Sequence, residues 1–160
     1  MEKKTLKNIL NFLEENEEKK HRYKDTFIWK YMFNEPLTKE DLVFKGDLIL
    51  ENIDISELPE GLYVRGDLNL YYSPIQELPK GLKIGGDLDL YGSEITQLPE
   101  GLKVGRDLNI QYSTMSSLPK GLKVGGDLNI DSSKSISRFS DEEIYEMIEP
   151  GFIEGKIHRQ

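Results

Sequence analysis

The chain has 160 residues, about the size of one domain, and its 21 basic and 29 acidic side chains leave a formal net charge of −8. This acidic balance argues against direct binding of nucleic acid. The lack of cysteine excludes disulfides, thiolate metal sites and cysteine nucleophiles, and the two histidines, His21 and His158, stand near opposite ends of the chain. We therefore expect no catalytic residue, no metal site and no cofactor.

The first part of the chain has the pattern of a helical cap. Apolar residues recur at helical spacing from Leu6 to Leu13 and predict an amphipathic helix over about residues 3–19. An aromatic segment over residues 23–33 predicts a second short helix that ends before Pro36. We interpret residues 1–41 as a helical N-terminal cap, and the alternative is that an exposed Trp29 anchors a partner.

The N-terminal segment also bears on location. Its mixed charge has neither the apolar core of a signal peptide nor the length of a membrane span. We expect a cytoplasmic protein with no membrane contact and no small-molecule substrate.

A twenty-residue repeat fills the centre of the chain. The segment LPEGLYVRGDLNL begins at Leu58 and returns with substitutions at Leu78, Leu98 and Leu118. An earlier, less regular copy keeps Gly46-Asp47-Leu48, so five coils span residues 42–137. Because one coil buries too few side chains to fold alone, the repeat predicts a solenoid in which each apolar column stacks on itself.

Each coil contains one segment with the pattern of a half-buried strand. In Asp67-Leu68-Asn69-Leu70-Tyr71 polar and apolar residues alternate with a period of two, so the leucines point inward and the other side chains face outward. We predict one strand per coil and one parallel β-sheet with an open face. The expected fold class is an α+β repeat solenoid with a helical cap at each end.

The repeat resembles a known family. The stretch from Leu88 to Pro99 resembles the L-x-L-x-x-N-x-L-x-x-L-P half of a leucine-rich repeat, in the short form found in bacterial effector proteins. The LPxGLxVxGDL half is similar to repeat proteins of bacterial and tailed-phage genomes. The chain departs from the motif where Gly85 replaces its first leucine and where serine replaces asparagine. The resemblance implies a leucine-rich-repeat-like scaffold that binds proteins.

The end of the chain predicts a second cap over residues 138–160. Ser140 and Glu143 form a capping box that opens a helix from Asp141 to about Glu149, before Pro150. The tail that follows either adds a last short strand or folds over the last coil.

A column of aspartates runs up the predicted open face, with one member in each coil: Asp47, Asp67, Asp87, Asp107 and Asp127. Like charges at the ~4.8 Å strand spacing repel one another by about 1 kcal/mol even in water. Either each carboxylate accepts backbone N–H groups of the adjoining glycine corner, or the column attracts a basic partner.

Two further columns on this face vary between coils: the second column contains Asn69, and the third contains Tyr71. Both use residue types that are common in protein interfaces. The predicted protein-binding residues are Asn69, Tyr71, Asp87, Asp89, Tyr91, Asn109, Gln111 and Tyr112. A second set holds Asp67, Asp107, Asp127 and Trp29. The alternative is an ordinary solvated sheet face.

These features favour a non-enzymatic scaffold that binds a protein partner on the open face of the repeats. An alternative is a small acidic inhibitor, phage-encoded and active in the host cytoplasm. It would occupy the nucleic-acid groove of a basic host protein such as a nuclease or a CRISPR complex. A carboxylate-dependent hydrolase and an oligomerising structural element are the remaining hypotheses.

Overall fold

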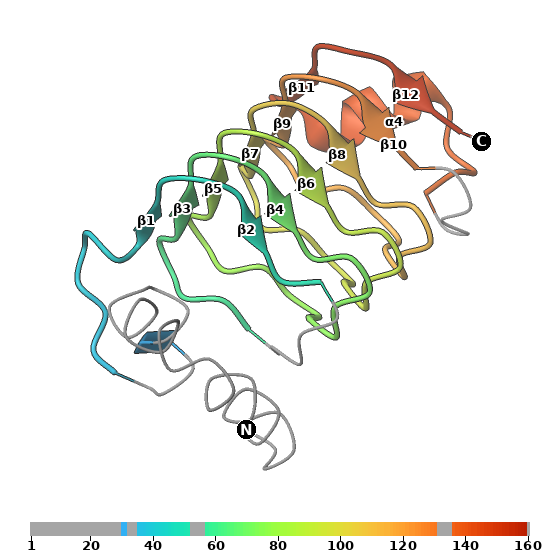
Figure 1. Cartoon of the computed structure of the whole chain (residues 1–160). Helices are drawn as coiled ribbons and strands as arrows, with labels where there is room; N and C mark the ends of the chain where they lie inside the picture. Colours follow the sequence, from blue (N-terminus) through green and yellow to red (C-terminus); the bar gives the residue numbers. More distant parts are fainter. Residues whose placement is uncertain (1–29, 32–34, 52–56, 131–135, 160) are drawn as a thin grey trace. The chain divides into compact units, whose positions relative to one another are not determined.

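The computed structural model describes residues 30–31, 35–51, 57–130 and 136–159 (Figure 1). The chain divides into two compact units, Met1–Leu42 and Val43–Gln160. The predicted N-terminal helices, apart from Lys30 and Tyr31, lie outside the described residues, and so does Trp29. No helix in the described ranges is long and apolar enough to cross a membrane.

The described part of the first unit is organised around Asp41. The Lys30 ammonium lies 2.9 Å from this carboxylate, and the backbone N–H of Thr38 donates to it over 2.8 Å. The hydrogen bond from Lys30 and those from Thr38 lower the pKa of Asp41 to about 2.

The second unit is a solenoid of parallel strands, and each coil contributes two strands of two residues (Figure 1). The first strands of the successive coils are β1 (Val43–Phe44), β3 (Tyr63–Val64), β5 (Lys83–Ile84), β7 (Lys103–Val104), β9 (Lys123–Val124) and β11 (Phe152–Ile153). The second strands are β2 (Leu48–Ile49), β4 (Leu68–Asn69), β6 (Leu88–Asp89), β8 (Leu108–Asn109), β10 (Leu128–Asn129) and β12 (Ile157–His158). Each series forms a six-stranded parallel sheet.

The repeat solenoid and its period of twenty residues are confirmed, because Leu68 pairs with Leu88 and Leu88 with Leu108 in register. The prediction of one strand per coil is wrong. A first strand precedes the predicted one, and a corner that includes Gly85 and Gly86 separates the two in the third coil. The second strand was predicted because the alternation continues beyond it, from Asp67 to Tyr71, whereas the alternation around the first strand ends after Ile84 at the glycine corner.

The interior of the solenoid consists of stacked apolar columns, as predicted. The leucine, valine and isoleucine side chains that recur every twenty residues are buried, among them Leu68, Leu88 and Leu108 with no exposed surface. A serine column lies with them, and the Ser93 hydroxyl donates to the Leu90 carbonyl over 2.7 Å. Each coil therefore buries its core only against its neighbours.

The C-terminal segment contains the predicted helix. Ser140 and Glu143 form both hydrogen bonds of the capping box, and α4 runs over Asp141–Ile148 with Ile144 and Ile148 buried. The tail then adds a strand to each sheet, β11 beside β9 and β12 beside β10. The last short strand considered for the tail is confirmed, and a second one accompanies it.

The stacked core predicts the effect of a truncation in the middle coil. Leu88→Ala should lower the free energy of unfolding by ~2–5 kcal/mol, because it leaves a cavity between two coils that cannot close around it. Urea denaturation followed by circular dichroism measures this change. Lys103→Ala, an exposed position of the next coil, is the control and should stay within about 0.5 kcal/mol. A Leu88→Ala loss as small as that of the control would contradict the stacked-coil account.

Candidate functional site

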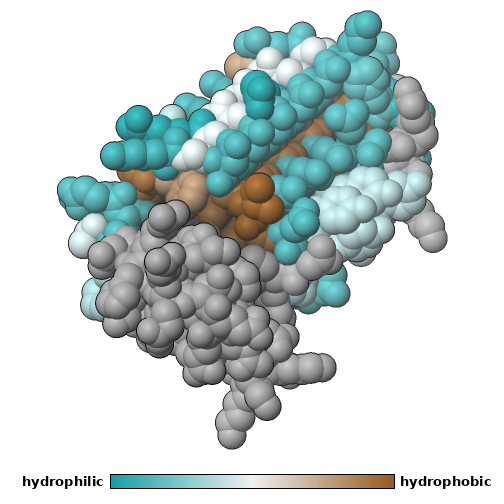
Figure 2. Space-filling model, in the orientation of Figure 1, coloured by the Kyte–Doolittle hydropathy of each residue, from teal (hydrophilic) through white to brown (hydrophobic). Residues whose placement is uncertain are grey.

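The open face of the β2–β12 sheet carries most of the predicted site residues. Figure 2 shows rows of hydrophilic residues along the molecule with a narrow hydrophobic strip between them. A shallow groove of about 320 Å³ follows this face, with Leu68 and Leu88 among its lining residues. The polar residues along it are Asp67, Asn69, Asp87, Asp89, Asp107, Asn109 and Asn129. We call it the acidic groove.

The aspartate column forms one wall of the acidic groove and bonds each coil to the next. In every coil the Oδ1 atom of the aspartate accepts the backbone N–H of the residue in the same position of the following coil. The donor and acceptor atoms lie 2.9 Å apart for Asp67 to Asp47, 2.9 Å for Asp87 to Asp67, 3.0 Å for Asp107 to Asp87, 2.8 Å for Asp127 to Asp107 and 2.8 Å for Lys156 to Asp127. The predicted acceptor role is confirmed, but the donor is the next coil and not the glycine corner.

This bond explains the glycine that precedes most of the aspartates. A Cβ atom on Gly86 would lie 2.0 Å from Oδ1 of Asp67, and one on Gly126 would lie 2.1 Å from Oδ1 of Asp107. Glycine is therefore favoured at this position, because a Cβ atom there requires the neighbouring atoms to shift.

Arg106 occupies this glycine position in the fourth coil and reaches back along the column. Its Nη2 lies 2.6 Å from Oδ1 of Asp67 and 3.2 Å from Oδ2 of Asp87, and its Nε lies 3.2 Å from Oδ1 of Asp87. The backbone N–H of Asp87, and after it Arg106, hold the pKa of Asp67 below its usual 3.8, and Asp67 raises the pKa of Arg106. The guanidinium thus offsets the repulsion between neighbouring carboxylates.

Sequence reasoning did not select Arg106. Its signal was present, because arginine replaces the glycine that the second, third and fifth coils place before the aspartate.

The opposite wall of the acidic groove stabilises the turns that follow the second strands. The side-chain oxygen of Asn69 accepts the backbone N–H of Tyr71 over 2.9 Å, and Asp89 accepts that of Tyr91 over 3.0 Å. Asn109 does the same for the following coil. This is the short-range bond that asparagine and aspartate both make in turns, which explains why Asp89 can take the place of the asparagine of the other coils.

Beside this wall four aromatic rings form a continuous group, the tyrosine cluster, made of Tyr71, Tyr72, Tyr91 and Tyr112. The rings of Tyr71 and Tyr91 stack with centroids 5.1 Å apart, and Tyr72 and Tyr112 lie against Tyr91 with centroids 5.8 Å and 4.9 Å from its own. Loss of hydration among the rings is the main cause that raises the pKa of Tyr71 and of Tyr91 above the usual 10. Tyr72 and Tyr112 each keep 54% of their surface exposed.

Two of these tyrosines have an unusual backbone conformation. Tyr72 has a φ of 49° and Tyr112 a φ of 56°, in the left-handed region that glycine adopts without strain. Gly92 occupies the same position of the coil between them with a φ of 62°. A Cβ atom on Gly92 would lie 2.7 Å from the ring of Tyr72, so this glycine leaves room for the ring.

The structure brings most of the predicted residues together but not all. Tyr72 was not among the predicted site residues, although it completes the tyrosine cluster. Gln111 is half-buried and does not line the acidic groove. Asp127 also lies outside the lining. It accepts the N–H of Lys156, and its Oδ2 lies 2.8 Å from Nε2 of His158.

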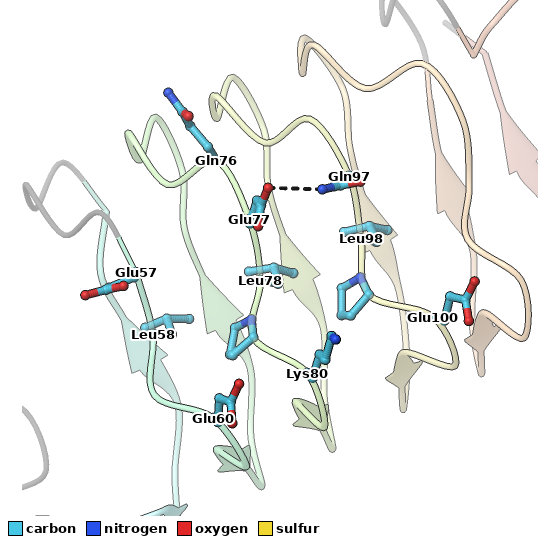
Figure 3. A pocket seen from close by; sticks show the side chains of 12 residues that line it. Glu57, Leu58, Glu60, Gln76, Glu77, Leu78, Lys80, Gln97, Leu98 and Glu100 are labelled. Carbon is cyan, nitrogen blue, oxygen red and sulfur yellow. Dashed lines mark hydrogen bonds between the residues drawn. The ribbon is translucent and has the colours of Figure 1, made fainter.

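A larger hollow of about 930 Å³ lies at the leucine-proline corners of the coils (Figure 3). Leu58, Leu78 and Leu98 line it. The side-chain amide of Gln97 donates to the carboxylate of Glu77 in the neighbouring coil over 3.0 Å. No predicted site residue lies in this hollow.

Within the described ranges, no group of three or more histidine, cysteine, aspartate or glutamate side chains is arranged to hold a metal ion. Comparison of the chain with protein-family models, with curated proteins and with solved structures finds no match in any of the three. The geometry of the acidic groove and of the tyrosine cluster therefore carries the functional argument.

Acid should weaken the solenoid through the aspartate column. Backbone N–H groups, from Asp87 to Asp67 and from Lys156 to Asp127, are the main cause that holds the pKa of each carboxyl below the usual 3.8. The unfolded chain therefore takes up protons at a higher pH than the folded one. The stability that these two groups contribute is present above about pH 4 and is lost as the pH falls further.

The urea midpoint, measured by circular dichroism at a series of pH values, should fall below about pH 4. Asp127→Asn, which keeps an acceptor for Lys156 but does not titrate, should show a shallower fall. A midpoint that does not change with pH in this range, or an unchanged slope in Asp127→Asn, would contradict this role of the column.

Proposed function

We propose that the chain is a non-enzymatic scaffold that binds a protein partner on the open face of β4, β6 and β8, with the tyrosine cluster as its anchor. One observation carries the proposal. Tyr72 and Tyr112 adopt a left-handed backbone that costs a non-glycine residue ~1–2 kcal/mol, although Gly92 shows that the coil accepts glycine at this position. Strain of this kind at exposed aromatic residues indicates that the side chains serve a purpose other than folding.

The chemistry of the cluster supports the same function. Tyrosine offers a large contact area with few rotatable bonds, and buried tyrosines in interfaces often supply much of the binding energy. The rings of Tyr71 and Tyr91 are already ordered by stacking, so binding would cost little further entropy. The resemblance of the repeat to leucine-rich repeats points to protein binding as well.

The carboxyl groups of the structure give no support to the hydrolase hypothesis. Asp41, Asp67 and Asp127 have lowered pKa values, whereas a general acid needs a raised one.

The acidic groove does support a second candidate, an inhibitor that occupies the nucleic-acid groove of a host nuclease or CRISPR complex. Arg106 weighs against it, because its guanidinium offsets one of the two negative charges of Asp67 and Asp87 in the middle of the column. An inhibitor of this kind would be released from its partner by salt and by duplex DNA.

Affinity capture with matched variants tests the scaffold. The double variant Tyr72→Gly and Tyr112→Gly imports the residue that the third coil has at this position, so the solenoid should fold with a similar thermal midpoint. A tagged protein incubated with a lysate of the source organism should capture a stoichiometric partner. The double variant should capture at least about tenfold less of that partner.

The control is the double variant Lys83→Ala and Lys103→Ala, which changes two exposed residues of the other sheet. Retention of the partner by the glycine variant, or an equal loss in the lysine variant, would refute this binding face. Release of the partner by duplex DNA would identify the inhibitor instead.

A further inference from the structure

We propose that the acidic groove receives arginine side chains of the partner, so that the segment bound on this face is an arginine-containing peptide. The proposal rests on the scaffold function proposed above and specifies the chemistry of the partner. Three features of the described residues carry it: a guanidinium of the chain itself, free carboxylate oxygens beside it, and the aromatic rings at the edge of the groove.

Arg106 shows how a guanidinium fits the aspartate column. It meets Asp87 side-on, with Nε and Nη2 each 3.2 Å from a different carboxylate oxygen, while Nη2 also reaches Asp67. This is the two-point arrangement that the planar guanidinium makes with carboxylates and that an ammonium group does not reproduce. The side chain of Arg106 keeps 60% of its surface exposed, so the position is open to solvent and to a partner.

Two carboxylates that line the groove have a free oxygen and make no hydrogen bond or ion pair with Arg106. Asp89 uses Oδ1 to accept the N–H of Tyr91, and Asp107 uses Oδ1 to accept that of Asp127. Within the described ranges, Oδ2 of neither residue accepts a hydrogen bond or an ion pair. Asp89 belongs to one wall of the groove and Asp107 to the other, so a cation in the groove would lie between them.

The aromatic rings complete the match to arginine. Tyr91 follows Asp89 by two residues, in the turn that the Asp89 carboxylate stabilises, and its ring stacks on that of Tyr71. The charge of Asp89 also contributes to raising the pKa of Tyr71, so the carboxylate acts on the stacked pair. A guanidinium stacks on an aromatic face and bonds to a carboxylate with its edge at the same time. A partner arginine can therefore use both features at once, and a lysine can use each only as a point charge.

The repeat supplies variants that are already compatible with the fold. Asp89→Asn imports the residue found at positions 69, 109 and 129, and it keeps the acceptor for the Tyr91 N–H. Tyr91→Gln imports the residue found at position 111. The control Glu77→Gln imports Gln97, removes the same negative charge as Asp89→Asn, and lies in the hollow at the leucine-proline corners.

Fluorescence polarisation with the full chain and three labelled peptides tests the proposal at physiological salt. The peptides alternate glycine with arginine, with lysine or with glutamate. The arginine peptide should bind about fivefold more tightly than the lysine peptide, and the glutamate peptide should not bind. Asp89→Asn and Tyr91→Gln should each weaken binding of the arginine peptide about fivefold, and Glu77→Gln should change it by less than about twofold.

Arg106→Gly gives a test in the opposite direction. The variant imports the glycine of the other coils and frees Asp67 and Asp87 for an external guanidinium, so the affinity for the arginine peptide should rise about threefold or more. Lys83→Gln removes the same positive charge from the other sheet and should raise it less.

Several results would overturn arginine recognition. They are a lack of binding by the arginine peptide, equal binding of the lysine peptide, an equal loss in Glu77→Gln, and no gain in Arg106→Gly. If any of these occurs while the glycine variant of Tyr72 and Tyr112 still loses its partner, the scaffold function stands and only the arginine chemistry fails. If the peptide binds as expected and the glycine variant of Tyr72 and Tyr112 captures the partner as well as the unmodified protein does, the proposed anchor is wrong instead.

Discussion

The hydrogen bond from the backbone of each coil to the aspartate of the coil before it is the interaction on which the rest of the solenoid depends. The backbone bonds between coils change direction at the corner between the two strands of a coil. The N–H of Gly86 donates back to the Gly66 carbonyl, that of Leu88 donates forward to the Asp107 carbonyl, and the N–H of Asp87 lies between them. The carboxylate supplies an acceptor at that corner in every coil. It thereby pairs the aspartate N–H at the point where the backbone bonds change direction, and it adds to the register that those bonds set.

The same bond determines which residues may surround the column. It crowds a Cβ atom on Gly66, Gly86 or Gly126 and so favours glycine there, while in the fourth coil Arg106 occupies this position. At the last coil the column ends in Lys156, whose N–H completes the bond to Asp127. A lysine side chain has no acceptor oxygen, so the row of carboxylate bonds in the described residues ends at Asp127.

Because the aspartates and glycines fix the stack, other positions of the face are free to differ between coils. The third column contains Glu51, Tyr71, Tyr91 and Gln111. The next position of each coil contains Tyr72, Gly92 and Tyr112 in the second, third and fourth coils. These changes gather the four rings of the tyrosine cluster beside the middle of the acidic groove. The proposed binding face thus combines a column that varies between coils with the aspartate column, which has the same residue in each coil from Asp47 to Asp127.

The sequence revealed the features that recur and missed those that depend on a single coil or on very short elements. The period of twenty residues predicted the buried columns, and the capping box at Ser140 predicted α4, because both are strong local patterns. The first strand of each coil was missed because Lys83 and Ile84 alone show no periodicity. The coil-to-coil donor of the aspartate bond and the reach of Arg106 to Asp67 depend on distances across coils, which the sequence does not contain.

Amide hydrogen exchange of the Asp107→Ala variant, followed residue by residue by nuclear magnetic resonance, tests most directly whether the aspartate bonds hold the coils together. The backbone N–H of Asp127 donates to the carboxylate that is removed, and that of Asp107 donates to Asp87, which remains. The account predicts that the Asp127 amide exchanges at least about tenfold faster in the variant, while the exchange rate of the Asp107 amide does not change. Unchanged protection of the Asp127 amide in a variant that is still folded would contradict it.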